Sequence, residues 1–272
     1  MSKSKIKKGI LGPAFRKFIR PVIQKYKIKR VDTKSIYQYK SQIENLRLLG
    51  FLQMYNESEN DNLIRVLNHM KNFCDEIVIY DDGSTDDSVE IALKYTKHVI
   101  RGKTNDFQNE LQHKQQLLNL ALSLNPDWIV WLDADEVFDR DGTTHGIRAL
   151  CNYGNVKGID GFSFQEFNLW KSTNKYRVDG LWNKLWQVRL WKNNENLKFL
   201  QEKGLHRQIY PLGLKKIYRS DIKVIHYGFS SEKKIKEKYE MYKKNGQTGK
   251  LLNMLIDETT IKLKKISPDL FS

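Results

Sequence analysis

The chain has 272 residues, 40% hydrophobic and 29% charged, the composition of a globular protein long enough to bury a sizeable core. No apolar run approaches the length of about 18 residues that a membrane-spanning helix needs. The net charge of +15 is concentrated at one end, because residues 1–30 hold eleven Lys or Arg and no acid. The remainder carries 36 basic and 32 acidic residues, a balance of +4 that argues against a nucleic-acid-binding body.

Residues 1–45 are predicted to be a basic amphipathic segment. Apolar side chains recur at helical spacing through residues 11–26, with basic side chains between them. Such a helix can lie on an anionic membrane surface or dock on the protein's own body. Arg16 and Lys17 interrupt the apolar stretch that a secretory signal would need. With only two cysteines, the chain is expected to be cytoplasmic, with residues 8–30 able to hold it at the inner face of a membrane.

From residue 46 to residue 140, apolar strands alternate with helices, which predicts right-handed crossovers and a parallel sheet covered on both faces. The polar ends of the first, second and fourth strands then share the edge where open α/β sheets bind ligands. Strands are expected within 48–57, 76–84, 98–102 and 127–135, and helices within 62–73, 85–95 and 110–124.

The rhythm changes after Arg140. Residues 158–170 and 184–192 have the pattern of long strands and are expected to form an antiparallel ribbon at the sheet edge. Residues 141–230 are therefore assigned to a second half of the same domain. Residues 231–272 read as charged C-terminal helices.

The stretch DWIVWLDADEVFDR brings a knot of carboxylates to the end of an apolar strand. Asp133 and Asp135 are two residues apart, so in an extended chain their side chains leave the same face and repel unless a cation lies between them. Mg²⁺ or Mn²⁺ suits such oxygen ligands. Acids also follow strands simply because the chain has reached water. The second acidic cluster at an equivalent strand end favours a site.

That second cluster is YDDGSTDDS, where Asp81 and Asp82 precede Gly83. A carboxylate there can accept hydrogen bonds from a ribose hydroxyl or a base N–H, while turn and cap chemistry explains the residues after Asp82. Tyr55, at the end of the first strand, can stack on a base, and Lys114 can meet a phosphate.

Two histidines in the second half, His206 and His226, can each complete a metal shell begun by carboxylates, and each can equally be structural. Rival chemistries fit poorly. The run GKT at 102–104 resembles the end of a P-loop, but Lys97 stands where that loop needs glycine. Motifs of Ser or Cys nucleophiles are not found in the sequence.

The motifs YNE, YDDGSTDDS and WLDADE, in this order, resemble family 2 glycosyltransferases of the GT-A fold over residues 46–140. VRLW, LHR and HYGF continue the resemblance more loosely, with counterparts in bacterial enzymes that build lipopolysaccharide or capsule. The resemblance implies a Rossmann-like α/β sheet and inverting transfer from a nucleotide sugar, usually a UDP-sugar, to a glycan or lipid-linked acceptor. It also implies Mg²⁺ or Mn²⁺ at the D-x-D motif. Residues 46–140 would bind the nucleotide sugar and residues 141–230 the acceptor.

Carried over by position, Asp82 would bind the base or ribose, Asp133 the ribose or metal, and Asp135 the metal. The other residues expected to bind the nucleotide-sugar donor are Tyr55, Glu57 and Lys114. The further metal ligands expected are His206 and His226.

The general base is where the sequence departs from the family. Many members have an acid before the RL strand, whereas NKLWQVRLW has none, and Arg207 replaces the glutamate that follows the histidine in some members. The nearest acids are Asp179, Glu166 and Glu202, and Asp179 is favoured because a flexible loop would carry it over the site.

Two rival functions remain open at this point. A metal-dependent nucleotidyltransferase would need a basic glycine-rich loop near the first strand, where QMYNESEN is acidic. A basic nucleic-acid-binding protein would lose its main activity on deletion of residues 1–30 and would bind less tightly as salt rises.

Overall fold

A computed structural model of the chain describes residues 29–36, 38–39, 45–143, 146–202 and 210–270. Nearly all of the predicted amphipathic helix, and His206, therefore lie outside the described residues. The described part begins with the short strand β1 (Arg30–Val31) and helix α2 (Thr33–Ile36). No helix in the described part is both long enough and apolar enough to cross a membrane.

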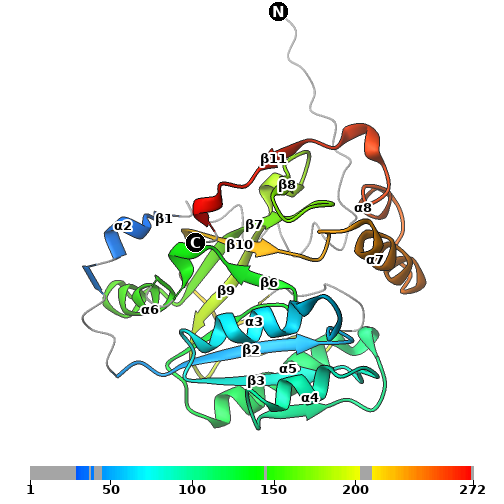
Figure 1. The fold of residues 1–272 in the computed structure, drawn as a ribbon. Helices are drawn as coiled ribbons and strands as arrows, with labels where there is room; N and C mark the ends of the chain where they lie inside the picture. The colour runs from blue at the N-terminus through cyan, green and yellow to red at the C-terminus, as the bar shows by residue number, and fades with distance from the viewer. Residues whose placement is uncertain (1–28, 37, 40–44, 144–145, 203–209, 271–272) are drawn as a thin grey trace, which may run out of the picture.

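The first half of the sheet is parallel, as predicted. Strand β2 pairs with β3 on one side and with β5 on the other, and β3 pairs with β4, all in parallel register. The strands are β2 (Leu48–Met54), β3 (Glu76–Asp81), β4 (Val99–Arg101) and β5 (Trp128–Trp131). The connecting helices are α3 (Asn62–Lys71), α4 (Ser88–Leu93) and α5 (Glu110–Ser123) (Figure 1).

Alternating side chains of β2 bury two different cores. Leu48 and Leu52 pack with α3 and α4 on one face of the sheet. Leu49 and Phe51 pack with α5 on the other face. Because the crossovers on the two sides of β2 cover opposite faces, the topological switch point of the sheet lies between β2 and β5, at the carboxyl ends of the strands.

The second half adds strands of both directions. Strand β9 (Trp186–Lys192) runs antiparallel to both β5 and β7 (Gly161–Asn168). The predicted antiparallel pairing is thus confirmed, but the ribbon lies inside the sheet, because β10 (Ile217–His226) pairs in parallel with β7 beyond it. The full order is β1-β10-β7-β9-β5-β2-β3-β4, with β6 (Glu136–Phe138) antiparallel on β10. Helix α6 (Gly146–Lys157) connects β6 to β7.

The sequence predicted helices throughout residues 231–272, but only part of this region is helical. Helices α7 (Glu232–Lys244) and α8 (Lys250–Asn253) are followed by β11 (Leu263–Lys265), which pairs with the edge of β8 (Lys175–Arg177). Backbone pairing with β8 is a tertiary contact that the charged sequence of β11 does not signal. Short 3₁₀ helices span Glu59–Asp61, Phe107–Asn109, Arg140–Gly142, Trp182–Lys184, Glu258–Thr260 and Pro268–Leu270.

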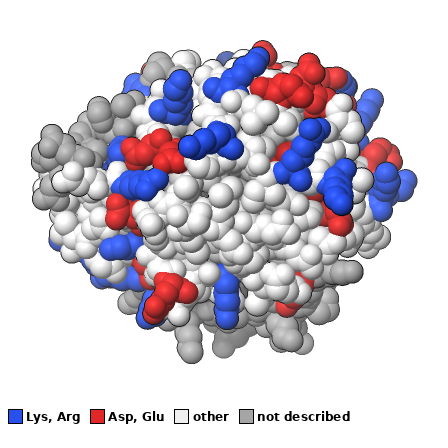
Figure 2. All heavy atoms as spheres, turned by 90° about the horizontal axis from the view of Figure 1, so that it is seen from below, with Lys and Arg blue, Asp and Glu red and all other residues white. Residues whose placement is uncertain are grey.

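The surface below the view of Figure 1 carries charges of both signs. Figure 2 shows basic and acidic side chains interspersed around a largely uncharged centre on this face. Such a mixture produces no strong field of one sign over the face shown.

Candidate functional site

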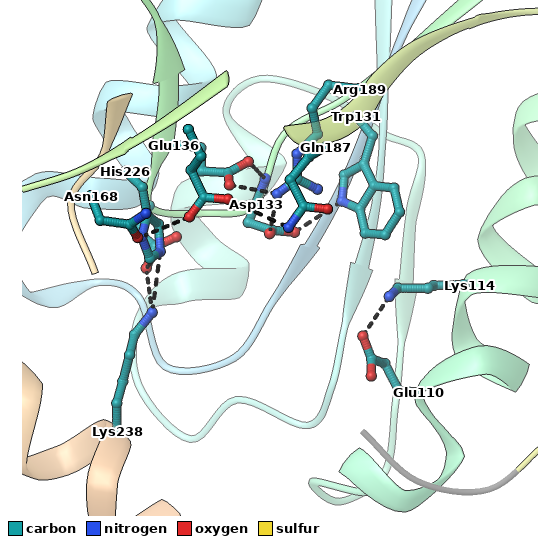
Figure 3. Close-up of polar contacts among 12 residues, drawn as sticks. Glu110, Lys114, Trp131, Asp133, Glu136, Asn168, Gln187, Arg189, His226 and Lys238 are labelled. Carbon is teal, nitrogen blue, oxygen red and sulfur yellow. Dashed lines mark hydrogen bonds and ion pairs between the residues drawn. The ribbon is translucent and has the colours of Figure 1, made fainter. Parts of the chain in front are cut away.

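The acidic motif lies in a turn rather than in an extended strand. Strand β5 ends at Trp131, and the amide of Glu136 donates to the carbonyl of Asp133 over 3.0 Å. The expectation that Asp133 and Asp135 leave one face of an extended chain is therefore wrong. Their carboxylates contact different partners, which Figure 3 draws around the ends of several strands.

Asp133 is held by a buried arginine of β9. One oxygen accepts from Arg189 Nη2 at 2.7 Å, and the other accepts from the indole of Trp131 at 2.9 Å. Arg189 also pairs with Glu136, and its guanidinium lies 4.9 Å from the Trp131 ring. Burial opposes ionisation of Asp133, but the charges of Arg189 and Lys114 together lower the pKa of Asp133. Its side chain remains 44% exposed, so Asp133 is accessible to a ligand.

Glu136 is almost fully buried beside the same arginine. Burial raises its pKa to about 8, against the attraction of Arg189. The antiparallel ladder of β6 and β10 places Glu136 directly opposite His226. Strand pairing therefore brings His226, a metal ligand expected from the sequence, to the acidic motif.

Asp135 is buried and faces a histidine and a lysine. Its Oδ2 accepts from Lys238 Nζ at 2.9 Å and lies 3.2 Å from His226 Nε2. Burial opposes ionisation, but His226 and Lys238 together lower the pKa of Asp135 well below its usual value. The pKa of His226 is raised, since Asp135 outweighs the effect of burial. His226 Nδ1 lies 2.7 Å from the amide oxygen of Asn168 on β7, which fixes the ring orientation.

The donor atoms around Asp135 fit a divalent cation, with a limit. In the described part of the chain, no three His, Cys, Asp or Glu side chains form a metal-binding group. Asp135 and His226 alone converge on one point, and Asp133 does not share it, contrary to the expected pair. Mg²⁺ commonly takes one or two protein ligands and completes its shell with phosphates and waters.

Gly228 lets the backbone approach that point closely. A Cβ there would lie 2.5 Å from Asp135 Oδ2 and 2.6 Å from His226 Nε2. Only glycine therefore lets the turn after β10 pass this close to both ligands.

The second acidic motif organises the loop after β4. Asp82 accepts from Asn105 Nδ2 at 2.9 Å and from the amide of Asp106, and lies 3.2 Å from His113 Nδ1. The neighbouring Asp81 accepts from the amide of Ser84. Asp82 thus holds two segments together, and the hydrogen bonds it makes within the protein are an alternative to the expected bond to a ribose or base.

The loops after β2 and β3 are joined through Asn56. Its amide donates to Ser84 Oγ at 2.9 Å, and its side-chain oxygen accepts from Thr85 N at 2.9 Å. The next residue, Glu57, has its pKa raised to about 7 by burial and by Asp135. Tyr55 packs edge-on against Phe107 with ring centroids 5.6 Å apart. Tyr55 and Glu57 therefore both belong to this edge of the sheet.

Lys114 approaches from α5. It is 3% exposed, pairs with Glu110 one helical turn earlier, and lies 4.4 Å from the centroid of the Trp131 ring (Figure 3). Because its charge contributes to lowering the pKa of Asp133, Lys114 acts on the same side of the motif as Arg189.

Of the three acids considered as a base, one lies in this cluster. Glu166 on β7 is 3.6 Å from His226 Nδ1 and accepts from Gln187 at 3.4 Å. Asp179 instead accepts from Nε and Nη2 of Arg177, at 2.8 and 3.0 Å, and from the amide of Lys262. Burial opposes ionisation of Asp179, but the Arg177 hydrogen bonds lower its pKa, which makes it a weak base. Glu202 is exposed at the last described residue before the gap at 203–209.

Sequence reasoning missed four residues of the cluster. Arg189 and Gln187 lie within the QVRLW run, which carried a signal only through the family resemblance. Asn168 ends a strand without any motif. Lys238 is one of several lysines on a charged helix and had no signal at all.

Comparison with known proteins finds one family match. The family described as Glycosyl transferase family 2 matches residues 51–210. An uncharacterized glycosyltransferase of Rickettsia conorii is 29% identical over 85 residues, which are 31% of this chain and 28% of that protein. The chain thus matches less than a third of the length of this curated relative.

Two solved structures are similar at low identity. The 1–349 fragment of TarS from S. aureus is 13% identical, with a TM-score of 0.48 over 78% of this chain and 69% of that one. Glucosyl-3-phosphoglycerate synthase from Mycobacterium tuberculosis, in complex with phosphoglyceric acid, is 15% identical, with a TM-score of 0.46 over 82% of this chain and 89% of that one.

Proposed function

Because the chain belongs to glycosyl transferase family 2, we propose that it transfers a sugar from a nucleotide-diphosphate sugar to a glycan or lipid-linked acceptor. A UDP-sugar is the first donor to test. The observation that carries the proposal is the cluster of Asp133, Asp135 and His226 at the carboxyl edge of the sheet, near the topological switch point between β2 and β5. Ligands of open α/β sheets bind at such switch points.

The donor side of the site comprises residues from the first half of the chain. Asp133 is exposed enough to meet a ribose or a phosphate-bound metal, and Lys114 faces the same motif. Asp82, Tyr55 and Glu57 border the same edge and are proposed to orient the nucleotide.

Asp135 and His226 are the residues proposed to hold Mg²⁺ or Mn²⁺. When bound, the ion supplies positive charge against the leaving diphosphate. The buried carboxylate of Asp135 is ionised at neutral pH, since its pKa is lowered against the effect of burial. Asn168 orients the imidazole toward the same point.

Inversion requires a base on the side opposite the leaving group. Glu166 is the proposed base: it takes the proton of the acceptor hydroxyl as that oxygen bonds to the anomeric carbon. The bond from this carbon to the diphosphate breaks, and the diphosphate leaves with its electrons. Asp179 is not proposed for this role, because Arg177 occupies its carboxylate.

The rival functions gain no support from the described residues. A nucleotidyltransferase would need a basic loop after β2, where Glu57, Glu59 and Asp61 lie. A nucleic-acid-binding protein would need a basic surface, whereas the chain after residue 30 carries 36 basic and 32 acidic residues and the one face in Figure 2 mixes both signs. Association of residues 8–30 with a membrane remains a proposal, which a vesicle-binding assay on the full chain and on a chain lacking residues 1–28 would test.

The test is turnover of a panel of UDP-, GDP- and CMP-sugars by the full chain with Mn²⁺, first as donor hydrolysis. We expect Asp135→Asn to reduce turnover at least about a hundredfold, because the charge that opposes the leaving diphosphate is lost. Glu195→Gln, at an exposed acid outside the site, is the matched control. Unchanged activity of Asp135→Asn would remove the metal assignment. A chain that neither binds nor turns over any nucleotide sugar would end the proposal.

A further inference from the structure

Helix α7 places a lysine ammonium at the point where Asp135 and His226 converge. Lys238 Nζ lies 2.9 Å from Asp135 Oδ2, 3.4 Å from His226 Nε2 and 4.9 Å from the centroid of the Phe229 ring. Figure 3 shows its side chain rising from α7 to the imidazole. A positive charge therefore already lies between the two groups that would bind a metal ion.

When His226 is in the neutral form that can bind a metal, the two acceptor groups require such a charge. Because Asn168 Oδ1 lies 2.7 Å from His226 Nδ1, that nitrogen carries a proton. In the neutral ring, Nε2 then presents its lone pair to Asp135 Oδ2 at 3.2 Å. Two lone pairs at this distance repel unless a cation lies between them.

Gly228 shows how closely the space is fitted to a cation. A Cβ at this position would lie 2.2 Å from Lys238 Nζ, in addition to its close approach to Asp135 and His226. The backbone turn, the carboxylate, the imidazole and the ammonium therefore share one small space, which a second cation cannot enter while the ammonium is there.

We infer that Lys238 is a resident cation that occupies the metal position between Asp135 and His226, and that a divalent ion must displace it to bind. The inference rests on the proposed function only in taking this pair as the metal ligands. It makes Lys238 a positioning residue that sets the affinity for the metal rather than a group that acts on the sugar.

Displacement is structurally feasible. The Lys238 side chain is 23% exposed and ends a flexible four-carbon stem, whereas the Arg189 side chain is 4% exposed and bound by two carboxylates. Helix α7 is anchored by Ile235, packed among Trp170, Phe229 and Leu252. The helix is also capped by Ser231, whose hydroxyl accepts from the amide of Lys234. Movement of the Lys238 side chain therefore leaves the docking of α7 intact.

The experiment measures Mn²⁺ affinity of the full chain without nucleotide, from the electron paramagnetic resonance signal of free Mn²⁺. We expect Lys238→Met to bind Mn²⁺ at least about tenfold more tightly than the wild type, because a cation at contact distance strongly disfavours a second one. Lys238→Arg keeps the positive charge and should stay near the wild type. Lys236→Met, at an exposed position of the same helix, is the matched control.

Two further variants secure the interpretation. Lys238→Gln removes the charge but can still donate to Asp135, so it should tighten Mn²⁺ binding even if Lys238→Met folds poorly. Gly228→Ala fills the shared space and should weaken Mn²⁺ binding, the opposite direction. Circular dichroism and thermal melting verify that each variant is folded.

The outcomes separate this inference from the proposed function. No gain in Mn²⁺ affinity for the neutral Lys238 variants, including no detectable binding by any protein, overturns the inference. A gain without turnover of any nucleotide sugar supports the inference and contradicts the proposed function. Turnover by the wild type without a gain in Mn²⁺ affinity in the variants supports the proposed function and overturns the inference.

Discussion

The two aspartates of one turn lie beside cations of different kinds. Asp133 faces a guanidinium that is buried, planar and shared with Glu136. Asp135 faces the single ammonium of Lys238 on a flexible stem. A guanidinium fork stays charged and keeps a fixed geometry, whereas an ammonium is a point charge that can move away. The comparison teaches that the two sides of the motif have different roles. Asp133 and Arg189 form a fixed side, which we call the framework side, whereas the cation beside Asp135 can be replaced, so we call Asp135 and Lys238 the exchangeable side.

The largest expected effect tests the framework side. Arg189→Met removes the cation beside Asp133 and leaves the buried carboxyl of Glu136 without its hydrogen-bond donor, so it should lower the free energy of unfolding by about 1–3 kcal/mol, the usual cost of an unsatisfied buried polar group. Urea denaturation near neutral pH measures it. Lys238→Met should lose less, because His226 remains beside Asp135, and added Mn²⁺ should recover its loss but not that of Arg189→Met. Equal losses, both recovered by Mn²⁺, would erase the distinction.

The next effect tests whether Glu166 or Asp179 is the general base. Glu166→Gln should lower kcat for transfer about a hundredfold, with the KM for the donor little changed, because a general base acts on the acceptor. Initial rates with varied donor measure both constants. Asp179→Asn should lower stability through its pair with Arg177 while changing kcat far less. The opposite ranking of the two variants would return the base to Asp179.

The parallel half of the sheet was predictable from the sequence because its signals are local. Alternating apolar strands, intervening helices and polar strand ends at Tyr55, Asp82 and Asp133 fix which side chains share one edge. The error at Asp135 has a physical origin. The period-two rule holds only while a strand continues, and β5 ends at Trp131, where the hydrogen bond from Glu136 to Asp133 closes a turn.

The sequence predicted His226 as a metal ligand, but it did not predict how His226 reaches the motif, nor the partners Arg189 and Lys238. Arg189 reaches Asp133 because β9 pairs with β5, and His226 reaches Asp135 because β10 pairs with β6. Neither antiparallel neighbour is determined by local pattern, since pairing between distant strands depends on the whole topology. Lys238 shows the limit most clearly, because its helix has many equivalent lysines and only tertiary packing selects one.

A smaller effect concerns the pH dependence of stability, through the buried acids Asp139 and Glu136. Burial raises the pKa of Asp139 to about 7 and of Glu136 to about 8. Each binds a proton in the folded chain that it lacks in the unfolded chain above its ordinary pKa. Stability therefore falls as pH rises toward these values, by at most about 1.4 kcal/mol per pH unit for each group. His69 has the opposite sign, because burial lowers its pKa to about 4, so its contribution grows as pH rises and is complete above about 6.5.

The substitution Asp139→Asn removes the contribution of Asp139 to the pH dependence of stability. Asp139 accepts from the amide of Lys223 at 2.9 Å, and it contacts neither aspartate of the motif by hydrogen bond or ion pair among the described residues. Urea denaturation at several values between about pH 5 and pH 8 should show a shallower decline in the variant than in the wild type. Glu195→Gln should keep the full decline. An unchanged slope for Asp139→Asn would mean that Asp139 is ionised in the folded chain.

The smallest expected effect concerns Lys114, which lies next to Asp133 on the framework side. Lys114 lies over Trp131, close enough to Asp133 to lower its pKa, but it is already paired with Glu110. Its charge should help to hold a diphosphate equally in the ground state and the transition state, so Lys114→Met should raise the KM for the donor by up to about tenfold and leave kcat nearly constant. Lys94→Met, exposed at the end of α4, is the matched control for loss of one positive charge. A fall in kcat at constant KM would contradict this expectation. It would mean that the ammonium of Lys114 stabilises negative charge that develops only as the diphosphate leaves.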